Sequence, residues 1–524
     1  MNSGPQEQGK ERQRRKQRRE QLKACLARAG LGSGPRLVKG STASIDYLER
    51  VIYTLSEMGL VFTRFGQYLA TRYDQIPAAD CLLLRKTGMG LRPTLDLASV
   101  LQAAFAAEPW SVLTQLQEIP AAYGRPMRRY QTILADGLVV NLSLQDPDFF
   151  AAWPVDSLLL DVLSPTLRQL WPYFRFEEIC QDFTRDMHLD TDAEAGRKWL
   201  VQNEQHKQSN HMVIPAYDKG HSNAEALVTT HPPVTSLRAL LDGERAGKPV
   251  NQAALPREIC LAWLQQALVG DWFPTGPDPQ NLAVLGDGRV LFRGGVTATL
   301  SKPLQARMVG YLMSVAAGNP DDAIAYIKTV LIPDENSNEQ VLQHRFRQIV
   351  PFRDGNWGRT GMADSLAEHL FVQWRVIGEC GYAMQPAFRH FCRGLAGVAY
   401  LSMKLAPESD VLRKALYEFR MKSGLEEMRQ GLGLENIGHQ AETFFAALTQ
   451  LPQRLEKLQE RAAQAPATPQ KTVEPQGITV LSLILVLLSL ALFSQHFSNA
   501  WAEPLSAVLF LFFGGLLLRL LMRS

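Results

Sequence analysis

The sequence has few cysteines, and none of them forms a disulfide or metal-binding pattern. The six cysteines stand at positions 25, 81, 180, 260, 380 and 392, and no two of them make a Cys-x-x-Cys pair. Scattered single cysteines support neither a disulfide framework nor a thiolate zinc site, so both classes are excluded. We therefore expect the body of the protein to occupy a reducing compartment.

Motifs of several common enzyme classes are also absent. The chain contains no GxxxxGK[ST], HExxH or GxSxG motif, and no Rossmann fingerprint opens a helix after a strand. These absences exclude P-loop NTPases, zinc metalloproteases, α/β-hydrolases and dinucleotide enzymes built on those motifs. His206 and His211 have no cysteine or carboxylate at ligand spacing, so we interpret them as surface residues.

Excess charge is small overall but concentrated at the amino terminus. The net charge is +3 over 524 residues, while residues 10 to 23, KERQRRKQRREQLK, are strongly basic. No apolar run follows closely enough to form a signal peptide, which argues against secretion. The basic segment fits a solvated, partly helical tail, a contact with anionic lipid or a nucleic-acid arm. The apolar segments described next favour lipid over nucleic acid.

Long apolar runs occur only near the carboxyl end. Residues 478 to 493 and 504 to 518 carry no charge, and a short polar turn separates them. With their flanks they approach the ~20 residues of a membrane span, although a buried core hairpin and a re-entrant hairpin are alternatives. Lys471, Arg519 and Arg523 lie outside the hairpin, so the positive-inside rule places both ends in the cytoplasm.

Between these ends the pattern changes from helical to mixed. Residues 42 to 105 have apolar residues at helical spacing, with a stop signal at Pro77. Residues 130 to 145, YQTILADGLVVNLSLQ, predict two strands joined by an Ala-Asp-Gly turn. A second hairpin is expected over 284 to 292, and residues 301 to 461 are expected to be almost wholly helical. The pieces predict an α+β fold.

The most specific motif is LVFTRFGQYLATRYDQIP, residues 60 to 77. In this motif the chain resembles the UbiB/AarF family of atypical protein-kinase-like proteins, which are linked to isoprenoid quinone biosynthesis and lipid metabolism. The family has Lys-x-Gly-Gln, then Ser-x-Arg-x-Asp, then Pro. The matching residues here are Gly66, Gln67, Arg72, Asp74 and Pro77. Arg64 stands at the lysine, which keeps the charge but exchanges a point ammonium for a forked guanidinium.

The resemblance continues into the nucleotide loop and the strand that carries the family's phosphate-binding lysine. Residues 120 to 147 align with this region without gaps. Bulky Tyr123, Arg125 and Pro126 then replace small residues of the loop, and Ser143 stands at the lysine position. Ser143 cannot supply the cation that steadies nucleotide phosphates. Arg125 or Arg128 is a candidate substitute.

The helix that carries the family's acidic segment reads DMHLDTDAEAGRKW, residues 186 to 199. Asp190 and Glu194 match the family pattern, whereas His188 stands at its first glutamate. Glu194 has lost its expected partner at position 143, so we interpret it as an exposed acid on a helix face.

The segment FPTGPDPQNLAVLGDGRVLFRGG, residues 273 to 295, aligns with the family's catalytic loop and metal-binding turn. Asn281 is kept, Gly276 stands at the catalytic aspartate, and Arg293 stands at the metal aspartate. Because Arg293 reverses the charge that Mg²⁺ needs, two metal ions are not expected. Asp278 is either a turn residue or a substitute base. We also hypothesise that Arg293 fills the metal space and pairs with Glu194 or Asp190.

The resemblance implies a protein-kinase-like two-lobe fold. It has family-specific N-terminal helices, a small mixed α/β N-lobe, a large helical C-lobe and a C-terminal transmembrane helical hairpin. The expected boundaries are 1–41 for a basic tail, 42–110 for the KxGQ-like helical extension, 111–235 for the N-lobe, 236–461 for the C-lobe, 462–477 for a linker and 478–522 for two transmembrane helices.

The lost lysine, base, metal ligand and pliable loop together predict a pseudokinase. We expect a membrane-anchored regulatory or scaffold protein, in a setting of isoprenoid quinone (ubiquinone) or lipid metabolism that the resemblance implies. The candidate nucleotide-cleft or regulatory residues are Arg64, Gly66, Gln67, Asp190, Glu194, Asp278 and Asn281. One alternative is a residual atypical ATPase or kinase that uses Asp278 and Asn281 with one metal ion. Another is a lipid carrier that needs no nucleotide.

The cofactors and partners implied by this interpretation are few. ATP or ADP is the candidate nucleotide, and Mg²⁺ is not expected. One expected partner is the membrane, contacted by the two C-terminal helices and by the basic N-terminus on anionic lipid. Prenyl lipid or quinone intermediates are expected ligands. The expected protein partners are a second copy, an intact UbiB-like protein or quinone-biosynthesis enzymes. Nucleic acid is not expected. The expected location is the inner or cytoplasmic membrane, with the globular domain facing the cytoplasm.

Overall fold

The computed structural model describes residues 5–31, 42–89, 98, 100–102, 113–119, 125–205, 211–223, 226–230, 234–241, 253–349 and 365–431. The expected linker (462–477) and membrane hairpin (478–522) lie outside these residues, as do Tyr123 and His206. No helix within the described ranges combines the length and the apolar character that crossing a membrane requires. The described residues up to Glu427 belong to one compact unit.

The part of the chain that the structure describes before the first strand includes the helices α1 (Pro5–Arg28), α2 (Thr42–Glu57), α3 (Leu60–Leu69) and α4 (Ala78–Leu84). Most apolar positions of α2 and α3 recur at helical spacing and are buried, with Ile45 and Tyr53 exposed, which fits the amphipathic pattern of the sequence. The basic segment expected as a tail forms most of α1. It packs on the body because Leu22, Cys25 and Leu26 are buried and Arg18 makes a 2.8 Å ion pair with Asp156.

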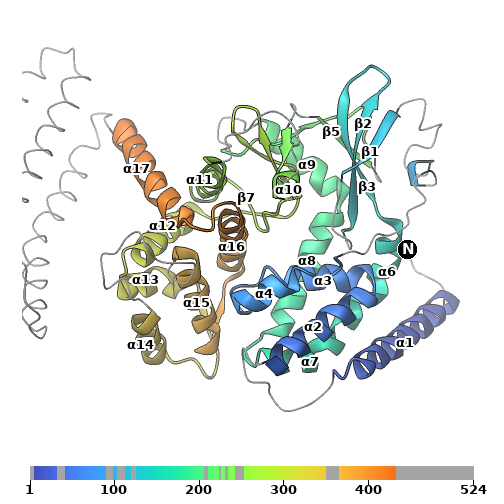
Figure 1. Cartoon of the computed structure of the whole chain (residues 1–524), viewed down its shortest axis with the longest axis horizontal. Coiled ribbons are helices and arrows are strands. Elements are labelled where there is room, and N and C mark those ends of the chain that lie inside the picture. Colours follow the sequence, from blue (N-terminus) through green and yellow to red (C-terminus); the bar gives the residue numbers. More distant parts are fainter. Residues whose placement is uncertain are drawn as a thin grey trace, which may run out of the picture. The chain divides into compact units, whose positions relative to one another are not determined.

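A five-stranded antiparallel sheet follows, in the order β1-β2-β3-β5-β4. Figure 1 shows β1, β2, β3 and β5 side by side. The strands are β1 (Leu113–Glu118), β2 (Met127–Leu134), β3 (Val139–Gln145), β4 (Ala216–Tyr217) and β5 (Ala226–Thr230). The predicted Ala-Asp-Gly hairpin joins β2 to β3, and Gly137 supplies the positive φ of 86° that the turn requires. In its register, Arg129 lies opposite Ser143.

Helices occupy the chain between β3 and β4. They are α6 (Pro147–Asp156), α7 (Ser164–Leu170), α8 (Phe176–Thr191) and α9 (Ala193–Gln205), with the 3₁₀ segment η2 (Ser157–Leu163) before α7. Asp146 begins α6 because its carboxylate accepts hydrogen bonds from the backbone N–H groups of Asp148 and Phe149. One face of α8, including Ile179, Phe183 and Met187, is buried in the apolar core. The same helix carries the acidic residues Asp182 and Asp186.

The rest of the described chain is mainly helical. Its helices are α10 (Leu237–Leu241), α11 (Leu255–Leu268), α12 (Lys302–Ala316), α13 (Pro320–Ile327), α14 (Glu339–Ile349), α15 (Leu366–Glu379), α16 (Pro386–Leu405) and α17 (Val411–Gly431). The predicted hairpin over 284–292 is confirmed as β8 (Leu282–Leu285) and β9 (Val290–Phe292), which join β6 (Val234–Ser236). Two short pairs are β7 (Phe273–Pro274) with β10 (Thr297–Ala298), and β11 (Leu331–Pro333) with β12 (Tyr382–Met384). The last pair interrupts the stretch expected to be helical.

Helix α16 presses directly against the loop that follows β7. A Cβ atom added to Gly394 would lie 2.6 Å from the Pro274 carbonyl oxygen, and one added to Gly397 would lie 2.7 Å from the Pro277 carbonyl oxygen. The indole N–H of Trp263 on α11 also donates to the Pro274 carbonyl, at 3.0 Å. The two glycines thus let α16 support the loop in which the sequence places the catalytic residues.

Candidate functional site

The loop from Thr275 to Asn281 is a compact turn closed by two side chains. The Asn281 side-chain oxygen accepts from the Asp278 backbone N–H at 2.9 Å, and its Nδ2 donates to the Gly276 carbonyl at 3.3 Å. Oδ1 of Asp278 accepts from the Gln280 backbone N–H at 2.7 Å. Asn281 and Asp278 therefore shape the loop, as Asx residues do in turns.

The second oxygen of Asp278 is also occupied, because Oδ2 makes an ion pair with Arg125. Burial favours the neutral acid, but Arg125, the Gln280 N–H and Arg64 together lower the pKa of Asp278 below its usual value. A carboxylate held in its charged form in this way is a weak proton acceptor. At Gly276 the backbone leaves open space where a Cβ would stand, so the base position holds no side chain.

The vacant lysine position has a cation opposite it. Ser143 on β3 is half-buried and pairs in register with Arg129 on β2, so both side chains lie on the same face of the sheet. Arg129 donates to the Gln280 carbonyl at 3.3 Å and to the Gly294 carbonyl at 3.4 Å. Burial and the neighbouring Arg125 lower the pKa of Arg129. Arg129 therefore connects the sheet to two loops, residues 275–281 before β8 and residues 293–295 after β9, which we call the functional loops.

The sequence pointed to Arg125 and Arg128 as candidate substitutes for the lysine, and it missed Arg129. Arg128 is buried and binds Asp146 at 2.8 Å, so it serves the start of α6. The turn gave a usable signal: the hairpin is centred on Asp136, and residues 129 and 143 are each seven positions away. Two residues equidistant from a hairpin turn face each other across the strands.

Arg293, at the family's metal-ligand position, has no acidic partner. Its backbone N–H donates to the Asn281 carbonyl at 2.8 Å, but its guanidinium makes no hydrogen bond or ion pair with a described residue. Nε of Arg293 is buried and unsatisfied. Burial and the nearby Arg129 lower the pKa of Arg293 to about 10. Gly294 and Gly295 follow it with φ of 108° and 134°, a backbone that side-chain-bearing residues rarely adopt.

The proposed pairing of Arg293 with Asp190 or Glu194 is wrong. Asp190 on α8 pairs with Arg64 on α3, at 3.5 Å. Glu194 at the start of α9 is exposed and pairs with its own helix neighbours Arg197, at 2.5 Å, and Lys198, at 3.8 Å. Local partners on α3 and α9 thus satisfy both acids. His188 is exposed, with its ring edge-on to Trp153.

Four arginines and two aspartates meet at this point, and we call them the arginine cluster: Arg64, Arg125, Arg129, Arg293, Asp190 and Asp278. The members come from α3, the segment before β2, β2 itself, α8 and the two loops around β8 and β9. Burial first, and then the Arg125 charge, lower the pKa of Arg64 to about 10. Two positive charges remain in excess after both aspartates are counted.

The signature residues next to Arg64 serve packing. A Cβ on Gly66 would come within 2.6 Å of a Thr87 methyl and within 3.1 Å of Leu55. The Gln67 Nε2 donates to the Thr87 carbonyl at 3.3 Å. Both residues fasten α3 to the segment after α4, and this contact sets where Arg64 enters the arginine cluster.

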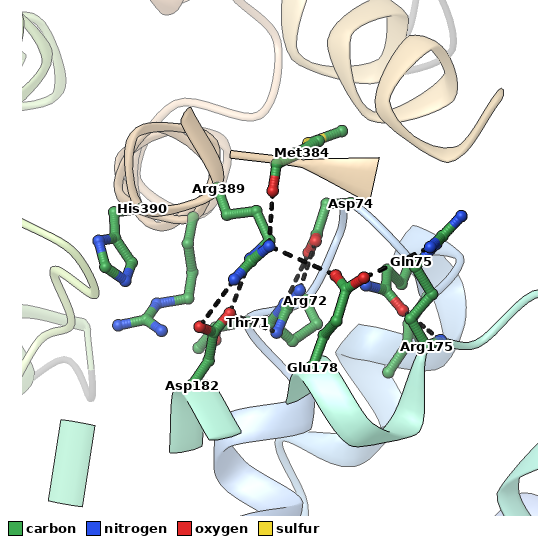
Figure 2. Close-up of polar contacts among 12 residues, drawn as sticks. Thr71, Arg72, Asp74, Gln75, Arg175, Glu178, Asp182, Met384, Arg389 and His390 are labelled. Carbon is green, nitrogen blue, oxygen red and sulfur yellow. Dashed lines mark hydrogen bonds and ion pairs between the residues drawn. The ribbon is translucent and has the colours of Figure 1, made fainter. Parts of the chain in front are cut away.

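Two further signature residues, Arg72 and Asp74, belong to a largely buried set of charges that we call the arginine–aspartate network: Arg72, Asp74, Asp182, Asp186, Arg389 and Arg393. Figure 2 shows its outer part, where Arg72 forms a two-pronged pair with Asp74 at 2.8 and 2.6 Å. Arg389 of α16 binds both oxygens of Asp182 on α8, at 2.8 and 2.9 Å, and reaches Glu178 and the Met384 carbonyl. The network joins the segment after α3 to α8 and α16.

Its inner part reaches the catalytic loop through Arg393. Arg393 pairs with Asp186, and it donates to the Tyr68 hydroxyl at 3.0 Å and to the Thr275 carbonyl at 3.0 Å. It also donates to the Thr275 hydroxyl at 2.6 Å. One buried guanidinium therefore connects α3, α8 and the residue directly before Gly276.

His390, next in the chain to Arg389, gives a testable pH response. Its Nε2 lies 2.6 Å from an Arg185 nitrogen, and burial, Arg393 and Arg185 lower the pKa of His390 from 6.5 to about 3. The unfolded chain then binds more protons between these values, so the folded state loses stability as pH falls below about 6.5. The charged groups that face His390 are Arg185, Arg389, Arg393 and Asp182.

We expect the urea concentration at the unfolding midpoint of the natural chain to be lower at pH 5 than at pH 7. The decrease should be smaller in His390→Gln. Glutamine keeps an acceptor for Arg185 but cannot gain a proton. His344→Gln, which removes an exposed imidazole from α14, is the matched control. Equal pH slopes for the natural chain and His390→Gln would contradict this assignment.

Comparisons with known proteins agree with the architecture. The family model of the ABC1 atypical kinase-like domain matches residues 91–327. A curated relative, AarF domain-containing protein kinase 1 of Xenopus tropicalis, is 23% identical over 135 residues, which cover 25% of this chain and 26% of the relative. The match thus spans about a quarter of the length of that relative.

Two solved structures are similar at low identity. The Rv3197–erythromycin complex from Mycobacterium tuberculosis has a TM-score of 0.36 and 16% identity, with coverage of 66% of this chain and 91% of that chain. Vaccinia related kinase 3 has a TM-score of 0.22 and 10% identity, with coverage of 62% and 94%.

The matched region, residues 91–327, contains the five-stranded sheet, α8 and both functional loops. The fold is kinase-like and mixes helix and sheet. The signature residues of α3 lie before the matched region, and the ion pair of Arg64 with Asp190 joins them to it. Residues 91–327 therefore match the ABC1 atypical kinase-like domain, and together with the curated relative they support placing the chain in the UbiB/AarF family.

Proposed function

We propose that this chain is a pseudokinase that works by binding and regulation instead of phosphoryl transfer. The observation that carries the proposal is Arg293, which stands where the family has its metal-binding aspartate. Its guanidinium lies near Arg129 and has no carboxylate partner among the residues that the structure describes. Mg²⁺ needs anionic oxygen ligands and neutralises phosphate charge during transfer, so two arginines at this place oppose its binding.

The alternative, a residual ATPase that uses Asp278 and Asn281, has less support. Both oxygens of Asp278 already have partners, in the loop backbone and in Arg125. Asn281 uses both ends of its amide within the same loop. A single metal ion at this position would have to displace Arg125 and open the turn.

The cellular setting remains a proposal from the family and the sequence. The chain is proposed to act as a regulatory or scaffold protein in isoprenoid quinone or lipid metabolism, anchored by the segment 478–522. Its proposed partners are an intact UbiB-like protein, quinone-biosynthesis enzymes or a prenyl lipid. Helix α1 supports a contact with anionic lipid, because Arg12, Arg15 and Arg19 are exposed, whereas the helix packs on the body through residues further along it, Leu22, Cys25 and Leu26.

The test of the pseudokinase proposal is phosphate release from ATP by the full chain in Mg²⁺. We expect equal, background-level release from the natural chain and from Asp278→Asn. Release above the background in the natural chain that disappears in Asp278→Asn would replace the proposal with the residual ATPase.

The membrane part has its own test, flotation of the full chain with neutral and with anionic vesicles in high salt. Because apolar spans bind lipid without charge, we expect flotation with both vesicle types. A chain that stays in the dense fraction with both would contradict membrane anchoring and leave the pseudokinase proposal standing.

A further inference from the structure

We infer that the arginine cluster is a binding site for the phosphate or pyrophosphate group of an anionic ligand, held without a divalent metal ion. The inference rests on the proposed function and names the ligand chemistry of the same site. In an active kinase, cations at this place stabilise phosphate through Lys and Mg²⁺. Here four guanidinium groups replace both.

The excess of positive charge in the arginine cluster favours an anionic ligand. Arg64 and Arg125 each have one aspartate partner, whereas Arg129 contacts only carbonyl oxygens and Arg293 has no described partner. Like charges in partly buried surroundings repel, and a bound anion relieves this repulsion. Burial first, and then a neighbouring arginine in each case, lowers the pKa values of Arg64 and Arg293. The second cause has the direction expected where positive charge is in excess.

The guanidinium N–H donors of the arginine cluster favour a phosphate group as the ligand. A guanidinium has five N–H donors in a planar fork that matches phosphate oxygens, and it binds them in pairs. In the cluster the Nε atoms of Arg64, Arg125 and Arg293 are buried without an acceptor. Buried unsatisfied donors are costly. Several phosphate oxygens would satisfy these groups, whereas a single carboxylate offers fewer acceptors.

The site needs no metal ion to hold the anion, because its carboxylates are already paired with arginines. The carboxylates that could coordinate Mg²⁺, Asp190 and Asp278, each pair with an arginine of the cluster. A metal-complexed phosphate also presents less negative charge to the cluster than the free anion does. The site should therefore bind free pyrophosphate more tightly than its magnesium complex.

A free nucleotide and a lipid headgroup share this chemistry. The first probe is inorganic pyrophosphate, titrated calorimetrically into the full chain in excess EDTA. We expect saturable binding that weakens when Mg²⁺ is in excess of pyrophosphate. Further arms use ADP and water-soluble dihexanoyl phosphatidic acid. The control for the latter is dihexanoyl phosphatidylcholine, whose headgroup has no net charge because choline balances its phosphodiester.

The variants Arg129→Met and Arg293→Met should each weaken pyrophosphate about tenfold or more, because each removes charge-assisted hydrogen bonds. Arg289→Met is the matched control, since Arg289 is an exposed arginine on the β8–β9 turn that pairs with Asp287. It should bind like the natural chain. Thermal melting of each variant without ligand verifies that it is folded.

Tighter binding of ADP than of pyrophosphate would support the site and identify a nucleotide as its source. Tighter binding of the phosphatidic acid, with no binding of the phosphatidylcholine, would support the site and identify a lipid headgroup. Absence of binding in every arm would overturn the inference, as would binding that needs Mg²⁺ or binding that Arg129→Met and Arg293→Met leave unchanged. ATP turnover measured on the same preparation keeps the two claims apart: background turnover without anion binding overturns only this inference.

Discussion

Arg393→Met is expected to lower the free energy of unfolding of the full chain by about 3–5 kcal/mol, the usual cost of breaking a buried ion pair from one side. Arg393 is 6% exposed, and its removal leaves Asp186 buried without its main cation. It also removes the donors to Thr275 and Tyr68. The measurement is urea unfolding followed by tryptophan fluorescence.

Two other arginines serve as controls for that experiment. Arg257 on α11 pairs with Glu418 at 2.6 Å and is largely exposed, so Arg257→Met should cost about 1 kcal/mol or less. Arg293 has no acidic partner, so Arg293→Met should leave stability unchanged or slightly raised. A loss in Arg293→Met as large as that in Arg393→Met would show that Arg293 is a structural lock, contrary to the contacts described.

Asp182→Asn is the second substitution with a large expected effect. Asp182 is 3% exposed, and its carboxylate pairs with Arg72, Arg185 and Arg389. Figure 2 shows Arg72 and Arg389 beside it. Asparagine keeps the shape but removes the charge. We expect a loss of about 3–5 kcal/mol in the free energy of unfolding at neutral pH, because buried arginines are left without a counter-charge.

The pH dependence of that loss gives a second readout. Burial opposes the charged form, but the Arg389 hydrogen bonds and the nearby arginines lower the pKa of Asp182 below its usual 3.8. A depressed pKa contributes stability that is present above 3.8 and is lost as pH falls below it. The difference between the natural chain and Asp182→Asn should therefore shrink at low pH.

Glu178→Gln is the matched control for Asp182→Asn. Glu178 lies one helical turn earlier on α8, is more exposed and contacts Arg389 at 3.3 Å. We expect a smaller loss of stability for it. Equal losses for the two variants would mean that Asp182 is not the centre of the network.

Local patterns in the sequence predicted much of the secondary structure. The hairpin around Asp136 follows from turn chemistry, and α2 and α3 follow from helical spacing of apolar residues. The structure places Gly276 in the loop before β8, Arg293 directly after β9 and Ser143 in β3. These features depend on neighbours in the chain, which a single sequence contains.

Contacts between distant segments could not be predicted in the same way. Arg389 and Arg393 lie on an apolar helix more than 180 residues from Asp182 and Asp186, and no local pattern links them. The partner of Asp190 was assigned to Arg293 because both align with kinase site positions. Arg64 on α3 pairs with Asp190 instead, since the ring contacts of Phe65 and Tyr68 with Phe183 hold α3 against α8.

The affinity of the full chain for ATP, measured by equilibrium dialysis in excess EDTA and again in excess Mg²⁺, tests the central claim most directly. The site is built from four arginines and two aspartates that form ion pairs with arginines. It should therefore bind ATP in EDTA as tightly as in Mg²⁺, or more tightly. Binding that appears only with Mg²⁺ would contradict this account, and it would return Asp278 and Asn281 to the role of metal ligands.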